Sequence, residues 1–103
     1  MRHEIGLDTI MWGSDYPHPE GTYPFTTECL RHTFHDVPAD EVQAILGGNA
    51  ARVYGFDMAK LQPVADRVGP LASDVAQPLT AAEVPQGFRE VQIRQGRETI
   101  EAA

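Results

Sequence analysis

Apolar residues first gather in a short run near the start of the chain. Thr9-Ile10-Met11-Trp12-Gly13 is rich in β-formers and is followed at once by the turn-prone Ser14-Asp15-Tyr16-Pro17. A short apolar run bounded by turn residues predicts a strand that is buried on both faces. Strands of that kind belong to parallel sheets covered by helices, so the run indicates an α/β fold. The sequence offers no second strand of comparable quality, although a parallel strand needs neighbours.

Downstream of a proline- and glycine-broken loop, the pattern becomes helical. Residues 26–34 predict a helix that is capped by one of the two threonines at its start. Residues 38–46 predict a second helix, because an acidic first turn suits the helix dipole and the apolar residues recur on one face. Gly47-Gly48 is expected to end this second helix.

Two shorter helices are expected after the glycine pair. Asn49 is placed to cap a helix over residues 50–54, which Gly55 would end. Asp57 is placed to cap a further helix that is broken or restarted at Pro63 and ends at a glycine six residues later.

The composition of the chain changes near residue 70. Prolines recur without a period and small residues dominate, so residues 70–87 are expected to lack regular structure. The charged stretch 88–103 is expected to form a frayed helix at most. We therefore divide the chain into residues 1–69, which carry the strand and the helices, and an extended, partly ordered tail over residues 70–103.

Composition narrows the classes of function. The 103 residues are enough for one small domain, and their net charge of -7 argues against binding to nucleic acid or to an anionic membrane. No apolar stretch is long enough to cross a bilayer, and the N-terminus lacks the apolar run of a signal peptide. Cys29 is the one cysteine, which excludes an internal disulfide. A cytoplasmic protein is the expected class.

The chemistry in this sequence is centred on Asp15. A buried strand that delivers a carboxylate at its C-terminal end places that group where parallel α/β barrels have their active sites. A carboxylate at such a point can hold a divalent metal or accept a proton from a metal-bound water. The alternative is that Gly13-Ser14-Asp15 is an ordinary turn, in which Asp15 only caps local N–H groups.

Two motifs decide between these interpretations. Gly13-Ser14-Asp15-Tyr16-Pro17-His18 is followed by Tyr23-Pro24 and, about thirty residues after the first motif, by Ile45-Leu46-Gly47-Gly48-Asn49-Ala50-Ala51-Arg52-Val53-Tyr54-Gly55. In this order the motifs resemble the C-terminal region of amidohydrolase family 2, the branch that includes the aminocarboxymuconate-semialdehyde decarboxylase-like enzymes. The resemblance covers roughly residues 1–70.

The resemblance implies a distorted (β/α)8 TIM barrel with residues 9–14 as its eighth strand and residues 26–34 as its eighth helix. Asp15 matches the strand-eight aspartate of the family, which ligates the metal and handles the protons of the metal-bound water. The metal is usually zinc, with manganese as an option. Residues 49–51 match a helix that packs under the barrel. Members of the family hydrolyse small-molecule substrates or decarboxylate aromatic acids.

The departures from the family pattern are as informative as the matches. The family's first strand supplies a His-x-His pair that this sequence lacks, and a barrel of this kind needs about 250 residues. Residues 2–5, followed by Gly6, read as the last turn of a helix, which suggests that something upstream is missing. We therefore expect the C-terminal piece of such a barrel, mostly helical on its own and inactive alone.

Three functions stay open at this point. The chain is a fragment of a metal-dependent hydrolase, a fragment of a non-oxidative decarboxylase of the same branch, or a non-catalytic piece that binds a partner. The expected partner is the missing barrel portion or a second copy of the chain. The small-molecule substrate would be bound only by the full-length enzyme.

Other side chains have weaker assignments. His18 follows Asp15 by three positions and is expected to face the substrate, although a loop histidine that only forms hydrogen bonds is equally consistent with the sequence. His32 and His35 have a spacing that a metal tolerates on a helix, but no further ligand is positioned for them. Trp12 is expected to pack, and Arg52 to cap a helix end or pair with an acid.

Overall fold

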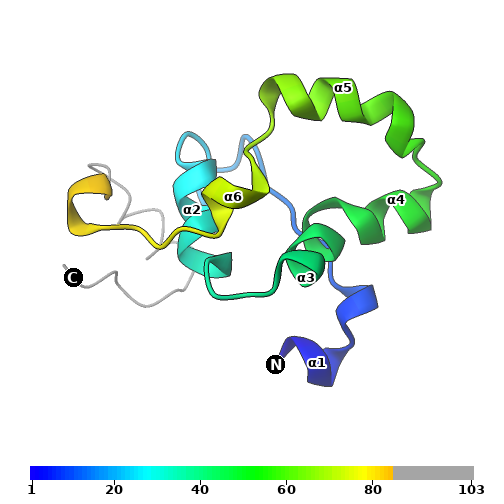
Figure 1. The fold of residues 1–103 in the computed structure, drawn as a ribbon, viewed down its shortest axis with the longest axis horizontal. Helices are drawn as coiled ribbons and strands as arrows, with labels where there is room; N and C mark the ends of the chain where they lie inside the picture. The colour runs from blue at the N-terminus through cyan, green and yellow to red at the C-terminus, as the bar shows by residue number, and fades with distance from the viewer. Residues whose placement is uncertain (85–103) are drawn as a thin grey trace.

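The computed structural model describes residues 1–84, and within this part every regular element is helical. Figure 1 shows the helices gathered in a loose cluster, with α5 standing apart from it. In chain order the elements are α1 (Arg2–Ile5), the 3-10 turn η1 (Leu7–Thr9), α2 (Thr26–Phe34), α3 (Ala39–Gln43), the π-helical turn η2 (Ala44–Gly48), α4 (Asn49–Tyr54), α5 (Met58–Val68), α6 (Ala72–Val75) and the 3-10 turn η3 (Ala81–Glu83).

The strand predicted at residues 9–13 is wrong. Thr9 ends the 3-10 turn η1, and Ile10 is extended with φ -97° and ψ 130°, but no ladder forms from it to residue 14. A strand exists only through hydrogen bonds to a neighbouring strand. The described residues contain no second extended segment beside this one; instead the Trp12 amide donates to the Ile45 carbonyl at 3.0 Å. Among residues 1–84 the structure therefore confirms the expected mostly helical character but not the strand.

The helix predicted at residues 26–34 is confirmed, with the same bounds as α2. Its predicted threonine cap is wrong, because Phe25 is the residue before the first turn and no side chain caps it. Helix α1, read from the sequence as a last helical turn before Gly6, is also confirmed.

The two helices predicted on either side of Gly47-Gly48 are one continuous helix over residues 39–54. The glycine pair lies inside the π-helical turn η2, where the Asn49 amide donates to the Ala44 carbonyl. Asn49 is therefore an internal residue and not a cap. The contacts of its side chain with η1 offset the cost that glycine carries inside a helix. The predicted end at Gly55 is confirmed, since Gly55 has the left-handed φ of 71° that favours glycine.

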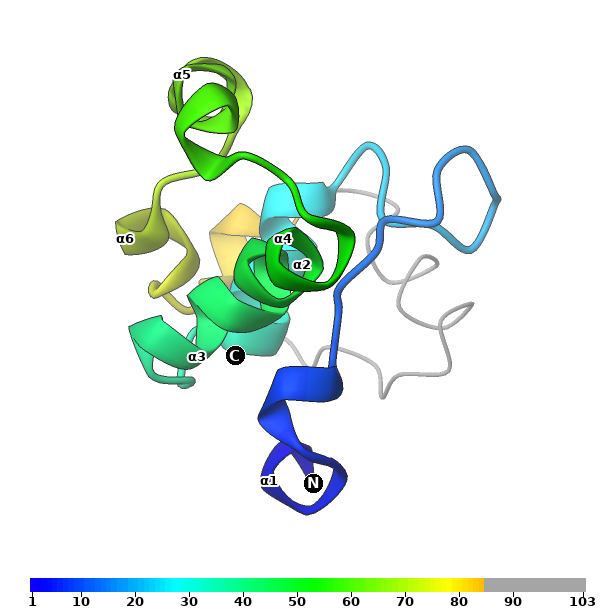
Figure 2. The ribbon, with the colours of Figure 1, turned by 90° about the vertical axis from the view of Figure 1, so that its right-hand side faces the viewer.

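Helix α5 begins where the sequence predicted it. The Asp57 carboxylate accepts hydrogen bonds from the amides of Ala59 and Lys60, so the predicted cap is confirmed. The predicted break at Pro63 is wrong, because the helix continues through it to Val68. No residue of α5 is buried, and Figures 1 and 2 both show this helix set off from the rest of the molecule.

The prediction that residues 70–87 lack regular structure is wrong for α6 and η3. Val75 in α6 is 3% exposed because it packs into the core beside α2, and this burial stabilises a short turn that local propensity alone would not. Thr80 and Glu83 form a capping box around η3. Residues 85–87, and the frayed helix expected over residues 88–103, lie outside the described residues.

The hydrophobic core lies where α2, the 39–54 helix and α6 meet. Its buried members are Leu30, Phe34, Val42, Ile45 and Val75. Trp12 is half-buried against them, which confirms the packing role predicted for it. The extended segment is therefore attached to the core twice, by the Trp12 side chain and by its backbone amide, and this attachment fixes the start of the loop that follows.

Candidate functional site

Asp15 lies at the start of a loop that is closed by backbone hydrogen bonds between its own residues. The Thr22 amide donates to the Ser14 carbonyl at 3.0 Å, the His18 amide to the Asp15 carbonyl at 2.8 Å, and the Gly21 amide to the His18 carbonyl at 2.9 Å. Asp15 itself has a φ of 57°, which a non-glycine residue rarely adopts. The loop therefore sets the direction in which the Asp15 side chain leaves the extended segment.

Gly21 is required for this closure. A Cβ at Gly21 would lie 2.7 Å from the Ser14 carbonyl oxygen and 3.0 Å from the carbonyl oxygens of Asp15 and His18. These oxygens belong to the backbone, so they cannot move aside without opening the loop. The next residue, Thr22, is 3% exposed, and its hydroxyl lies 3.0 Å from the hydroxyl of Thr26 in α2. The loop is thus closed by Gly21 and anchored on α2.

His18 is brought next to Asp15. Its Nδ1 lies 3.1 Å from the Asp15 carboxylate and 3.3 Å from the Glu20 amide. The two contacts require opposite states of Nδ1, since the carboxylate needs a proton there whereas the Glu20 N–H needs a lone pair. The side chains of Asp15 and His18 are 71% and 55% exposed, so solvent screens their attraction. The contact between the two side chains therefore contributes little to stability.

These residues do not by themselves fit a catalytic metal. No group of three or more His, Cys, Asp or Glu side chains that could hold a metal occurs among residues 1–84. A catalytic zinc usually has three protein ligands, whereas Asp15 and His18 offer two donors that also contact each other. His3 and His35 are engaged elsewhere, His3 with Glu41 and His35 with the Arg31 carbonyl.

Asn49 and Arg52 hold the segment before Asp15 in place. The Asn49 amide group donates to the carbonyls of Leu7 and Ile10 at 2.8 and 2.9 Å, and this side chain belongs to a residue that is 4% exposed. Arg52 donates to the Asp8 carbonyl at 2.7 Å, so it pairs with the backbone of η1 and not with an acid. Both residues belong to the second sequence motif, whose role in the described structure is to support the first.

A second polar centre, which the sequence did not predict, surrounds Arg31. The Arg31 guanidinium donates to both oxygens of Glu83, at 2.7 and 3.1 Å, and to the carbonyls of Gln77 and Pro78. The hydrogen bond from Arg31, with those from Thr80, lowers the pKa of Glu83 to about 2, and the same bond raises the pKa of Arg31. No local signal indicates this pairing, because the partners lie about fifty residues apart.

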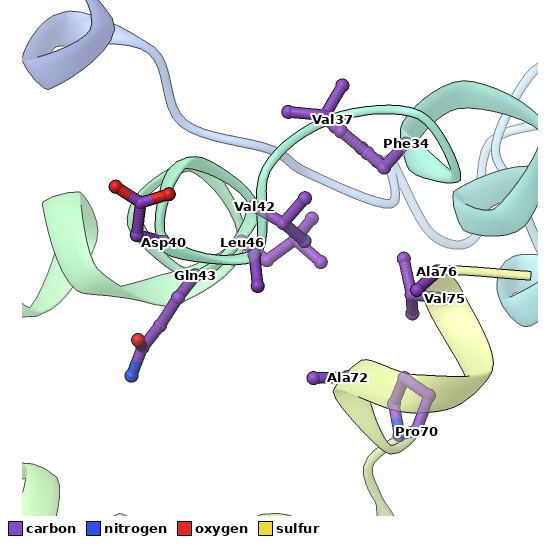
Figure 3. A pocket seen from close by; sticks show the side chains of 11 residues that line it. Phe34, Val37, Asp40, Val42, Gln43, Leu46, Pro70, Ala72, Val75 and Ala76 are labelled. Atoms are coloured by element: carbon purple, nitrogen blue, oxygen red, sulfur yellow. The ribbon is translucent and has the colours of Figure 1, made fainter.

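An apolar hollow of the described structure lies away from Asp15. A cavity of about 500 Å³ lies between α3 and α6, and its lining includes Phe34, Val42, Leu46, Pro70 and Val75. Figure 3 shows Val42 and Leu46 across from Pro70 and Val75, with Phe34 at the top of the view. Neither Asp15 nor His18 lines it, so the carboxylate and the cavity are separate features of the described structure.

Asp15 thus lies on a loop that follows an extended segment and is anchored to the next helix, and in α/β barrels the loops after the strands carry the active-site residues. The chain matches the family model for amidohydrolases, family 2, over residues 2–56, which is more than half of its length. The chain belongs to amidohydrolase family 2, a TIM-barrel family that is typically metal-dependent. No curated protein and no solved structure matched it. Within residues 1–84, no helix is long and apolar enough to span a membrane.

Proposed function

We propose that this chain supplies the eighth-strand region of a metal-dependent hydrolase of amidohydrolase family 2, with Asp15 as a metal ligand and as the acid that handles protons at the metal. The observation that carries the proposal is the family match over residues 2–56, which includes Asp15 and its loop. The metal would be zinc or manganese, and the remaining ligands would come from a His-x-His segment and other histidines outside this chain.

The loop geometry supports this role for Asp15. Gly21 and Thr22 close and anchor the loop, and the carboxylate is left 71% exposed, so it is accessible to ligands from elsewhere. His18 stands beside it and would face a small-molecule substrate. With the carboxylate engaged elsewhere, His18 Nδ1 would accept from the Glu20 amide, and its Nε2–H would be left to donate to the substrate. Decarboxylation of an aromatic acid would use the same two residues.

The first experiment is a zinc titration of the isolated chain at neutral pH. We expect no site of submicromolar affinity, because the described residues offer two donors at most. A submicromolar site in the isolated chain that disappears in Asp15→Ala would show that the chain holds a complete metal centre by itself. The inference that its other ligands lie outside would then be wrong.

The second experiment supplies the missing ligands. The chain is combined with a family 2 polypeptide that carries strands one to seven, and the zinc retained after gel filtration is measured for wild type, Asp15→Asn and Asp36→Asn. Asp36 is an exposed aspartate away from the loop and serves as the matched control. We expect Asp15→Asn alone to lose zinc. Equal retention in all three complexes would remove Asp15 from the ligand set.

A further inference from the structure

Residues 77–84, which we call the strap, leave α6 and pass alongside α2, where Figure 1 shows them in yellow and orange. Their polar attachment to α2 is concentrated on one side chain. Arg31 Nε donates to the Gln77 carbonyl at 2.9 Å, Nη2 donates to the Pro78 carbonyl at 2.9 Å, and Nη1 and Nη2 bind the Glu83 carboxylate. The Arg31 side chain is 13% exposed beneath these partners.

The apolar attachment of the strap is small. Leu79 and Val84 are half-buried, and together with Phe25 they cover Cys29, which is 1% exposed and forms no disulfide. Within the strap the regular structure is the single 3-10 turn η3. The segment thus has few buried apolar contacts and little internal structure, which are the properties of regions that open locally.

Helix α6, just before the strap, is held separately. Val75 is 3% exposed and belongs to the main core with Leu30 and Phe34, so α6 does not depend on Arg31 for its position. The contacts of Arg31 begin two residues later, at Gln77. The strap can therefore rotate about the short connection at Ala76 while Val75 stays in the core.

We propose that the strap opens and closes over α2 as one unit, while α2, the 39–54 helix and α6 remain folded. The hydrogen bonds of the Arg31 guanidinium hold the strap in its closed position. Because two carbonyls and one carboxylate bind the same planar group, losing that group releases both ends of the strap together. Opening uncovers Cys29, whose thiol then reports the event. This device is independent of the role proposed for Asp15.

The test is the rate at which the thiol of Cys29 in the full chain reacts with a disulfide reagent such as dithiobisnitrobenzoate at neutral pH without denaturant. We expect Arg31→Met to raise this rate by about tenfold or more, because it removes several charge-assisted hydrogen bonds at once. The urea midpoint followed by Trp12 fluorescence should stay close to that of wild type, since Trp12 lies on the main core. Glu83→Gln keeps the two carbonyl contacts and should give a smaller increase.

Arg52→Met is the matched control, because Arg52 also donates to a backbone carbonyl, that of Asp8, but has no contact with the strap. It should leave the labelling rate unchanged. The proposal is overturned by equal rates in wild type and Arg31→Met, or by rates that rise only with urea and in parallel with the Trp12 transition. If Arg31→Met does not fold, Glu83→Gln decides by the same two criteria.

Discussion

Replacing Asn49 with alanine should destabilise the described fold more than most single changes in this chain. The Asn49 amide group donates to the carbonyls of Leu7 and Ile10, and the residue is 4% exposed, so water cannot easily replace it. Two lost hydrogen bonds at about 1 kcal/mol each, plus the cost of leaving an acceptor poorly satisfied, predict a loss of about 2–3 kcal/mol. The segment that leads to Asp15 would lose one of its attachments to the 39–54 helix.

The assay is urea unfolding followed by Trp12 fluorescence, since Trp12 packs on the core beside this contact. Asn49→Asp keeps the size but removes both donors and places a charge near two carbonyl oxygens, so it should cost at least as much as Asn49→Ala. Gln62→Ala removes an exposed side-chain hydrogen bond on α5 and should change the stability by less than about 0.5 kcal/mol. A loss in Asn49→Ala no larger than that in Gln62→Ala would refute the reasoning.

Three further outcomes are expected. Asp57→Ala removes the carboxylate that accepts two amides at the start of α5 and should lower the stability of that helix by about 1 kcal/mol, seen as faster amide exchange there, whereas Asp57→Asn should not. Titration of Glu83 by NMR should give a midpoint near 2, returning toward its ordinary value of 4.5 in Arg31→Met. Because this pKa is lowered on folding, the Glu83 contribution to strap closure is complete above about 4.5 and is lost as the pH falls toward 2. In sedimentation, the chain should self-associate through the exposed apolar side of α5, and a monomer with a sharp melting transition above about 45 °C would contradict this.

The elements that the sequence predicted well are those decided by neighbouring residues. Helix α2 and the ends of α4 and α5 follow from local periodicity, from the carboxylate cap at Asp57 and from the glycine at residue 55. Each of these signals acts within one or two helical turns. The family resemblance, which the match over residues 2–56 confirms, likewise rested on contiguous motifs.

The elements that the sequence predicted wrongly depend on contacts between distant residues. The apolar run around Trp12 has the composition of a strand, but a strand needs partners that are absent from residues 1–84. Gly47-Gly48 resembles a helix end, yet the helix continues because the Ile45 carbonyl and the Asn49 side chain bind the segment before Asp15. The proximity of His18 to Asp15 could be anticipated from their spacing, whereas the contacts of Arg31 could not.

Because of the π-helical turn η2, the support of the Asp15 loop depends on the number of residues in the 39–54 helix. A π turn absorbs one residue more than an α turn, so the flanking helical segments keep the orientation that an uninterrupted α-helix one residue shorter would give them. Deletion of Gly47 would leave both flanks facing the same way, with Asn49 still directed at η1. The Ile45 carbonyl, however, would return to the ordinary helical ladder, and the Trp12 amide would lose its acceptor. A relative that is one residue shorter here would need a different contact to hold the segment that leads to the aspartate corresponding to Asp15.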